Sequence, residues 1–583
     1  MPTFDLIIRG GTVVDGTGAQ RYQADIAVKD GLIAQVGDVT GDAAEEIDAS
    51  GLVVTPGFVD IHTHYDGQAT WDQEMAPSSW HGVTTVVMGN CGVGFAPARR
   101  DKHEWLIGLM EGVEDIPGTA LAEGINWEWE SFPEYLDALE KLPRTVDVGT
   151  HVPHGAVRAY VLEDRERPGA VPTADDIAKM ADIVEEGVRA GALGFSTSRT
   201  VLHRDIEGEV VPGTTATAEE LVEIGRAMGR VGHGVFEMAS DMMREWDEFG
   251  WMGKLSRETG LPVTFAALQS IAKELPLEEQ ISTMRAENDN GANIVAQIAL
   301  RGNGIVMAWQ GTVHPFRFRP SWQAIEELPW EEQKAKLLDP AFKAQLLSEQ
   351  NDLSEVNQDI VGLIMVVCAG WTMQFEMDPD FDYEPTAEES IAARAAKAGV
   401  SGDEYAYDLL CRDDGKGFIY LPILNYADGN LDFLMDLQQS DDTVNSLSDG
   451  GAHCGTICDA ASPTFMLQHW VRDRERGTIT LENAIKRQCS DTARLYGLED
   501  RGIIAPGYLA DLNVIDMDAL KLGKPWLAFD LPAGGKRLLQ KADGYVATIK
   551  SGTITFRDGK WTGETPGGLI RGPQRVEMAE AAE

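Results

Sequence analysis

Two histidines that stand two residues apart, directly after an apolar run, constrain this chain more than any other feature. The run Leu-Val-Val (52–54) leads into Pro-Gly-Phe-Val-Asp-Ile-His-Thr-His (56–64). Side chains two apart on a strand point the same way, so we expect His62 and His64 to project together from the end of a strand. Two imidazoles fixed in this way form half of a divalent metal site. The alternative is a pair of surface histidines in a turn; the preceding apolar run and Asp60 favour the metal site.

The bulk composition limits the partners of the chain. Its 583 residues fit one large barrel with an accessory domain, and its net charge of −45 argues against nucleic acid or an anionic membrane as a partner. We expect no signal peptide and no membrane span, and the six scattered cysteines form no disulfide framework. The sequence therefore predicts a cytoplasmic homo-oligomer that acts on a small molecule.

The two ends of the chain differ in pattern from its middle. Residues 1–54 and 501–568 hold short apolar runs separated by turns, and we expect them to pair into one β-sandwich. An acidic tail follows at 569–583. Between these ends, residues 55–500 alternate apolar runs with amphipathic stretches, which indicates βα units around a parallel sheet.

Three further residues stand at the ends of apolar runs. Cys91 lies in Gly-Asn-Cys-Gly (89–92), Asp449 in Ser-Asp-Gly (448–450), and Glu237 after Gly-Val-Phe (234–236). A thiolate and a carboxylate are both metal ligands. The alternatives are a buried structural cysteine, an Asp-Gly turn and an ordinary ion pair. The three together with the histidine pair favour a metal site.

These features together resemble the amidohydrolase superfamily, whose first barrel strand carries Pro-Gly-(apolar)-(apolar)-Asp-x-His-x-His. Residues 502–512 are similar to a second segment of that superfamily, Gly-x-Ile-x-x-Gly-x-x-Ala-Asp-Leu. The added Gly-Asn-Cys-Gly and Ser-Asp-Gly resemble one branch, the N-acyl-D-amino-acid deacylases (D-aminoacylases). The resemblance extends from Asp5 to about Gly568 and includes 153–158 and 191–197.

The resemblance implies the architecture. We expect an α/β fold, a (β/α)8 TIM-like barrel plus the β-sandwich that the N- and C-terminal segments form. Guided by it, we assign eight barrel strands: 52–61, 83–88, 146–149, 192–195, 234–237, 262–266, 293–298 and 444–447.

The segment 303–440 is far longer than a βα unit requires. We expect an insertion that either covers the barrel mouth as a lid or serves as a structural or oligomer-forming elaboration. As a lid, it would use tryptophans such as Trp309 and Trp322 to wall the substrate pocket.

The resemblance also implies a ligand set, from which this sequence departs. In the D-aminoacylases the cysteine and histidines of strands five and six bind metal, and the final Asp is catalytic. Here Glu237 stands at the strand-five position, and 263–269 contain no histidine. We therefore predict that His62, His64, Cys91, Glu237 and Asp449 bind Zn²⁺, as one or two ions, or another divalent metal. The departure makes a pair of metal ions less expected than one.

Four other residues are candidates for substrate binding. His154, and also His151, follow the third predicted strand and could stabilise an oxyanion. Arg158 and Arg199 could pair with a substrate carboxylate, although ordinary salt bridges are an alternative for each.

The chain is thus predicted to be a metal-dependent hydrolase of a C–N amide bond, with an N-acyl amino acid as substrate. A divalent metal lowers the pKa of the water that it binds to roughly 7, and Asp449 would act as general acid and base. Hydrolysis of a cyclic amide, ester or lactone on the same scaffold is an alternative. A third hypothesis is a catalytically inactive barrel that acts as a binding or scaffold protein.

Overall fold

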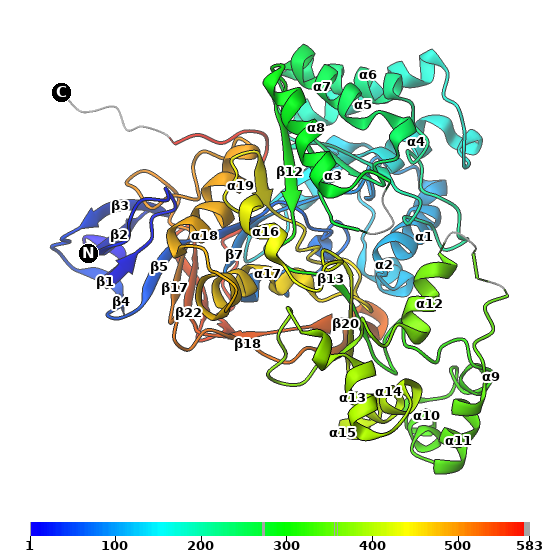
Figure 1. The fold of residues 1–583 in the computed structure, drawn as a ribbon. Helices are drawn as coiled ribbons and strands as arrows, with labels where there is room; N and C mark the ends of the chain where they lie inside the picture. The colour runs from blue at the N-terminus through cyan, green and yellow to red at the C-terminus, as the bar shows by residue number, and fades with distance from the viewer. Residues whose placement is uncertain (1, 271–273, 355, 358–359, 577–583) are drawn as a thin grey trace, which may run out of the picture.

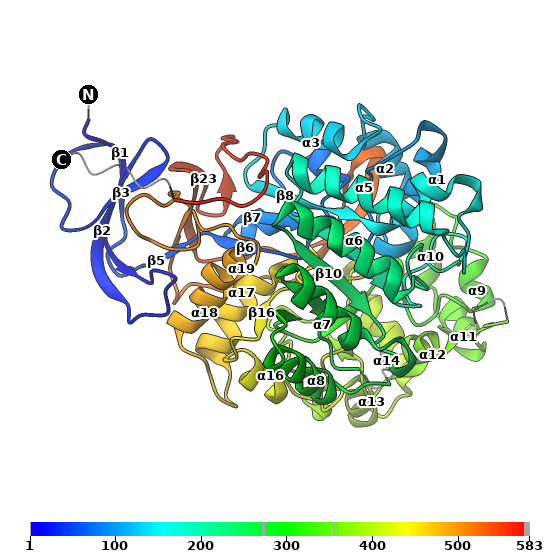
Figure 2. The ribbon, with the colours of Figure 1, turned by 90° about the horizontal axis from the view of Figure 1, so that it is seen from above.

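An eight-stranded parallel sheet forms the centre of the molecule (Figures 1 and 2). A computed structural model describes residues 2–270, 274–354, 356–357 and 360–576; the predicted end of the acidic tail, 577–583, lies outside them. The eight strands overlap the eight predicted segments, which confirms the barrel assignment. The first segment, 52–61, is divided, because residues 53–56 pair in a second sheet and only residues 58–60 belong to the barrel. They are β6 (Phe58–Asp60), β7 (Val83–Met88), β8 (Asp147–Pro153), β9 (Gly194–Arg199), β10 (Val235–Ser240), β11 (Val263–Ala266), β12 (Ile294–Ile298) and β16 (Thr443–Asn445).

The barrel closes at the carboxyl ends of its first and last strands. The sheet runs in the order β16-β12-β11-β10-β9-β8-β7-β6, and an isolated parallel bridge joins Thr63 to Gly450. The His64 N–H donates to the Gly450 carbonyl at 2.8 Å, and the Asp449 N–H donates to the His62 carbonyl at 3.2 Å. The same contacts that close the barrel therefore bring the histidine pair beside Asp449.

Helices cover the outside of the sheet, as Figure 2 shows for α3, α5, α6 and α7. Two amphipathic stretches of the predicted βα units form α5 (Ala174–Ala190) and α6 (Ala218–Val231), and the side chains of Thr173 and Thr217 cap their first turns. No helix in the described ranges has the length and apolar character of a membrane span. The other helices of this layer are α1 (His103–Glu114), α2 (Gly118–Gly124), α3 (Phe132–Glu140), α4 (His154–Leu162), α7 (Glu248–Thr259), α8 (Leu277–Asp289), α16 (Asp432–Leu437), α17 (Ser462–Phe465), α18 (Leu481–Gln488) and α19 (Ser490–Leu495).

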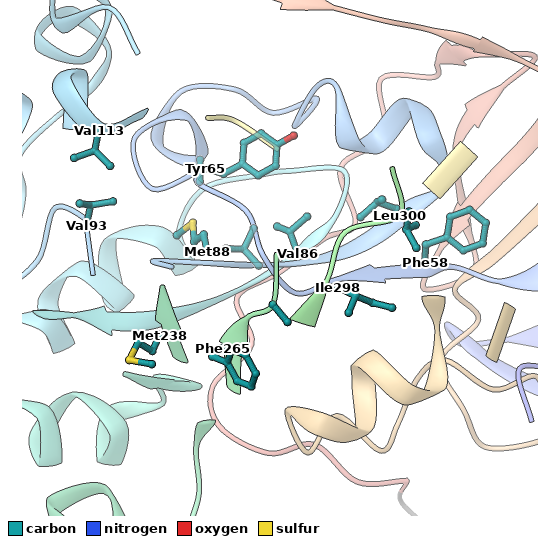
Figure 3. Packing of buried hydrophobic residues seen from close by; sticks show 14 of the residues in the cluster. Phe58, Tyr65, Val86, Met88, Val93, Val113, Met238, Phe265, Ile298 and Leu300 are labelled. Atoms are coloured by element: carbon teal, nitrogen blue, oxygen red, sulfur yellow. The ribbon is translucent and has the colours of Figure 1, made fainter. Parts of the chain in front are cut away.

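The main hydrophobic core contains side chains that alternate along the barrel strands. Val86 and Met88 on β7 share this buried cluster with Met238, Phe265 and Ile298 from three other strands (Figure 3). Because neighbours on a strand point to opposite sides, the residues between them, such as Glu237 and Gln297, face the barrel interior. The interior thus receives polar side chains from the same strands that supply the apolar core.

The two ends of the chain meet in one mixed sheet of nine strands beside the barrel (Figure 1). Strand β17 (Leu512–Ile515) pairs with β5 (Val53–Pro56), so the C-terminal segment joins the N-terminal one directly. One buried cluster takes residues from both segments, which supports the predicted sandwich. The other strands of this sheet are β1 (Phe4–Val13), β2 (Tyr22–Lys29), β3 (Leu32–Gly37), β4 (Ala43–Asp48), β22 (Tyr545–Lys550), β23 (Thr553–Arg557) and β24 (Lys560–Trp561).

The segment between β12 and β16 forms a unit with its own core. Its sheet consists of β13 (Asn303–Met307), β14 (Phe375–Glu376) and β15 (Ile419–Leu424). Trp309 and Trp322 are 2% and 3% exposed inside that core, so the prediction that these two wall the substrate pocket is wrong. Its helices are α9 (Pro320–Gln323), α10 (Trp330–Leu337), α11 (Pro340–Ser348), α12 (Val361–Ala369), α13 (Ile391–Ala398), α14 (Gly402–Leu410) and α15 (Arg412–Gly415).

A hairpin from the C-terminal segment leaves the nine-stranded sheet and reaches the barrel. It consists of β19 (Trp526–Leu531) and β20 (Gly535–Leu539), and its Leu538 N–H donates to the Cys454 carbonyl at 2.6 Å. Cys454 lies in the loop that follows β16 and Asp449. The C-terminal segment therefore contributes to the surroundings of the site as well as to the sandwich.

Candidate metal centre

His62, His64 and Cys91 form a buried cluster beyond the carboxyl ends of β6 and β7. One ligand atom from each lies within 4.8 Å of the others, and the side chains of His62 and His64 are each 1% exposed. Cys91 Sγ lies 3.4 Å from Nε2 of His62. The three predicted ligands that stand on the first two strands are thus brought together, with the imidazole and thiol groups that zinc favours.

A tight turn carries Cys91 into this cluster. Cys91 has a φ of 54°, a backbone conformation that non-glycine residues rarely adopt, and Gly92 follows with a φ of 70°. A Cβ atom on Gly92 would lie 2.9 Å from the backbone nitrogen of Ser198, so only glycine fits there. The Cys91 N–H donates to Oε2 of Glu237 at 3.0 Å, which holds the turn against strand β10.

Asp449 approaches the cluster from the loop after β16. Its Oδ1 lies 3.6 Å from Nε2 of His62 and 3.8 Å from Nε2 of His64. The Asp449 side chain is 16% exposed, whereas that of Glu237 is fully buried. Asp449 is therefore the predicted ligand that solvent or a substrate can reach.

Glu237 lies behind the cluster, inside the barrel. Its Oε1 is 3.9 Å from Nδ1 of His62 and has no hydrogen-bond partner in the described part of the chain. A buried carboxylate oxygen without a partner is costly unless a cation or a proton compensates it. The position is consistent with the predicted ligand role of Glu237, which stays a prediction.

Two residues that were not predicted from the sequence, Gln297 and Glu114, lie next to the Nδ1 atoms of the two histidines. Nδ1 of His62 donates to Oε1 of Gln297 at 2.9 Å, and Gln297 also accepts from Ser446 Oγ at 2.7 Å. Nδ1 of His64 lies 3.2 Å from Oε1 of Glu114, the last residue of α1. The hydrogen bond to Gln297 fixes the orientation of the His62 imidazole and leaves its Nε2 free for the metal. Nδ1 of His64 forms no hydrogen bond among the described residues, and the Glu114 carboxyl group is the acid within reach of it.

Burial shifts the titration of every group in the cluster toward the neutral form. It lowers the pKa of His62 to about 4 and that of His64 well below its usual value, with neighbouring histidines adding to the effect on His64. Burial also raises the pKa of Glu237 to about 8 and, with Asp459 and Asp60, that of Asp449 to about 8. The pKa of Cys91 is raised well above its usual value by burial and then by Glu237.

The donor set fits a divalent metal. Neutral imidazoles offer lone pairs, and a cation among Cys91, Glu237 and Asp449 would offset the desolvation that holds these acids protonated. Nitrogen, sulfur and oxygen donors together are the ligands of zinc sites. His62, His64, Cys91 and Asp449 supply four such donors around one position, with Glu237 behind them.

Two further histidines lie near the cluster. Nε2 of His453 is 3.6 Å from Oε2 of Glu114, so this carboxyl group stands between His64 and His453. Nδ1 of His203 bonds Oγ of Ser198 at 2.9 Å, and charge on His203 would lower the pKa values of His64 and His453. His203 lies in the loop after β9, and its sequence neighbours do not indicate a role at the site.

His151 faces the barrel interior below the cluster. It is completely buried, neither ring nitrogen has a hydrogen-bond partner among the described residues, and its ring centroid lies 5.4 Å from that of Tyr496. Burial lowers the pKa of His151 to about 3, with His62 adding to the shift. A neutral imidazole at this place has donors and acceptors free for a water molecule.

The other three candidates for substrate binding have partners of their own. His154 lies 3.0 Å from Glu220, and Arg158 bonds the same carboxylate at 2.6 and 2.8 Å. Arg199 bonds Glu248 at 2.8 Å. All five side chains are buried, so a substrate would have to break a buried ion pair to reach either arginine.

A parallel barrel with a histidine and cysteine cluster at the carboxyl ends of its strands defines a class of protein, the metal-dependent hydrolases that act on C–N bonds other than peptide bonds. The chain belongs to the amidohydrolase family, whose pattern its residues 45–556 match.

Relatives support this assignment over the whole chain. A D-aminoacylase from Alcaligenes xylosoxydans xylosoxydans is 28% identical over 579 residues, which cover 97% of each chain. An N-acyl-D-aspartate deacylase from the same organism is 33% identical over 230 residues, which cover 39% of this chain and 42% of that one.

Two solved structures share the fold. A D-aminoacylase that defines a subset of amidohydrolases is 23% identical, with a TM-score of 0.62 and coverage of 97% of this chain and 100% of the other. The N-acyl-D-glutamate deacylase from Bordetella bronchiseptica, solved with zinc and a phosphonate inhibitor, is 22% identical, with a TM-score of 0.62 and coverage of 99% and 100%.

Proposed function

We propose that this amidohydrolase removes the acyl group from N-acyl amino acids with the help of one zinc ion. The observation that carries the proposal is the cluster of His62, His64 and Cys91, with the reachable carboxylate of Asp449 at 3.6–3.8 Å from both imidazoles. One relative that covers 97% of this chain is a D-aminoacylase, which supports the substrate class.

His62, His64, Cys91 and Asp449 would hold the metal, and Glu237 would complete or support the set. When bound, zinc supplies a Lewis acid that activates water and polarises a carbonyl group. Gln297 and Glu114 keep the two imidazoles turned toward this position. Since the ligands sit on different strands, the barrel itself fixes their geometry before a substrate arrives.

Asp449 would move the proton of the reaction. It accepts a proton from the attacking water, whose oxygen forms a bond to the amide carbon. It then delivers this proton to the amide nitrogen as the C–N bond breaks. The products are a carboxylic acid and a free amine, so the atoms and charges balance. Burial raises the pKa of Asp449 to about 8, and a cation held at the cluster would lower it from there, so that the carboxylate could accept a proton near neutral pH.

The contacts of the other predicted residues indicate which of them are free to bind water or substrate. His151 has both ring nitrogens free in the barrel interior and is suited to hold water near Glu237. His154, Arg158 and Arg199 stay predictions as substrate ligands, since carboxylates already occupy them. All six cysteines are unpaired, which supports the proposed cytoplasmic location. The homo-oligomeric state also stays a prediction.

A substrate panel tests the proposal. Purified protein loaded with zinc is offered the N-acetyl derivatives of D- and L-amino acids, a hydantoin and a lactone, and the release of amine or acid is followed. We expect hydrolysis of N-acetyl amino acids that an Asp449→Asn variant loses by at least two orders of magnitude. Turnover of the cyclic compounds alone favours the alternative substrate class, and zinc without any turnover favours the binding protein.

A further inference from the structure

A small cavity lies at the seam between the first and the last strand of the barrel. Its volume is about 30 Å³, and its walls come from β6, from β16 and the residues after it, and from α17 and α18. Phe58 and Leu300, which Figure 3 shows near one another, belong to its apolar side. A water molecule needs roughly 10–15 Å³, so the cavity has room for water or for a small ion. Its polar lining residues are Asp60, Asn445, Ser446, Ser448, Ser462 and Gln488.

Two amide side chains on the wall of this cavity lack hydrogen-bond partners. Asn445 and Gln488 are each 4% exposed, and both the nitrogen and the oxygen of each amide are unpartnered among the described residues. A buried amide that has lost its hydrogen bonds to water and gained none destabilises a fold. Because the two amides line one cavity, a single ligand inside it can bind both.

Asp60 adds a negative charge to the same wall. It is 7% exposed, and its carboxylate accepts hydrogen bonds from Oγ of Ser448 and, at 3.4 Å, from the His62 N–H. It forms no ion pair with the residues that the structure describes. A buried carboxylate without a cation nearby is costly, so a positive charge in the cavity would stabilise Asp60 in its ionised form.

The chemistry of the lining indicates what the cavity binds. Carboxylate, amide and hydroxyl oxygens are the ligands of hard cations, and the described residues that line the cavity include no cysteine and no histidine. One carboxylate among neutral oxygens balances one positive charge, whereas a divalent cation would leave an excess charge buried. Water would bond the amides of Asn445 and Gln488 but would leave the charge of Asp60 uncompensated.

We propose that this cavity binds one monovalent cation, Na⁺ or K⁺, through Asp60, Asn445 and Gln488. The cation links the first barrel strand to the last and to the end of α18. Asp60 stands two residues before His62, and Ser448 is the neighbour of Asp449, so the cation also holds both sides of the metal centre in place. The site is separate from the cluster that binds zinc, and it does not require that the chain hydrolyse any substrate.

A salt series tests the site without a substrate. The thermal unfolding midpoint of the zinc protein is measured in mixtures of NaCl or KCl with tetramethylammonium chloride at one ionic strength. The constant ionic strength keeps the screening of the net charge of −45 the same. We expect Na⁺ or K⁺ to raise the midpoint in a saturable way, by about 2 °C at a hundredfold excess over the dissociation constant. Equal midpoints in all mixtures overturn the proposal.

Matched substitutions locate the cation. Gln488→Met and Asn445→Leu remove the amide atoms with little change in side-chain size, and we expect each to lose the shift that Na⁺ or K⁺ produces. Gln438→Met is the control, because Gln438 is also buried with both amide atoms unpartnered among the described residues but does not line this cavity. It keeps the shift. Circular dichroism establishes that each variant is folded, and either cavity variant suffices where the other does not fold. A full shift in a folded cavity variant overturns the assignment.

Discussion

Nδ1 of His64 lies 3.2 Å from Oε1 of Glu114, and both side chains are 1% exposed. Glu114 is the last residue of α1, so the helix ends on the metal centre. Although the two atoms do not form a hydrogen bond in the structure, Glu114 lies on the Nδ1 side of His64, and Nε2 is 3.8 Å from Oδ1 of Asp449. A carboxylate behind an imidazole raises its basicity and fixes its orientation, which strengthens metal binding.

Replacing Glu114 with Ala is expected to weaken zinc binding by roughly 10–100-fold, because the imidazole of His64 loses its support. Glu114→Gln keeps an oxygen acceptor and should fall between Ala and the natural residue. Competition with a chelator measures the affinity. Glu104→Ala, an exposed acid on the same helix, is the matched control. Equal affinity in Glu114→Ala and Glu104→Ala would reject the role of Glu114.

Glu237→Gln tests whether the carboxylate behind the cluster binds metal. The substitution keeps the shape and the bond from the Cys91 N–H but removes the charge. If Glu237 is a ligand, zinc affinity should fall by a decade or more, on the scale of about 1.4 kcal/mol per tenfold. The same chelator competition measures this. Unchanged affinity and turnover would leave His62, His64, Cys91 and Asp449 as the ligand set.

A buried ion network joins the barrel to the nine-stranded sheet and makes stability depend on pH. Asp147 on β8 lies 2.7 Å from Arg501 and 3.0 Å from Lys550. Although burial opposes the shift, Lys550 and Arg501 lower the pKa of Asp147 to about 2, from a usual value of 3.8. A lowered pKa stabilises the fold fully above the usual value, and this stabilisation is lost as the pH falls from about 4 toward 2.

Asp147→Asn should therefore destabilise the protein by about 1.5–3 kcal/mol near neutral pH, since Arg501 and Lys550 lose the carboxylate that they share and keep only Asp500 and Asp511, each at 2.9 Å. Urea unfolding at pH 7 and at pH 3 measures the change. The difference between the variant and the natural protein should shrink at the lower pH. A difference that is independent of pH would show that the charge of Asp147 is not what stabilises the junction.

The family resemblance and local patterns together predicted the barrel and most of the cluster. His62, His64, Cys91 and Asp449 follow short apolar runs directly, so their side chains share one end of the sheet. Glu237 was identified because a carboxylate interrupts an apolar run. In each case the neighbouring residues in the sequence indicate the direction in which the side chain points.

The residues that the sequence missed owe their positions to contacts between distant segments. In the sequence, Glu114 is one of several acids on an amphipathic helix. Only the packing of α1 brings it within 3.2 Å of Nδ1 of His64. Leu538, whose N–H donates to the Cys454 carbonyl, lies in a segment that was expected to belong wholly to the sandwich. Trp309 and Trp322 were expected at the pocket because aromatic residues often wall ligand sites, yet they are the core of a separate unit. The spacing of residues in the sequence does not show which distant segments pack against one another.

The metal content of the purified protein shows whether His62 and His64 belong to a metal centre. Zinc is measured by elemental analysis in the natural protein and in the double variant His62→Ala/His64→Ala, with circular dichroism to establish that both are folded. We expect stoichiometric zinc in the natural protein and none in the folded double variant, with loss of hydrolysis. Stoichiometric zinc retained by the double variant, or a natural protein that binds no divalent metal, would contradict it.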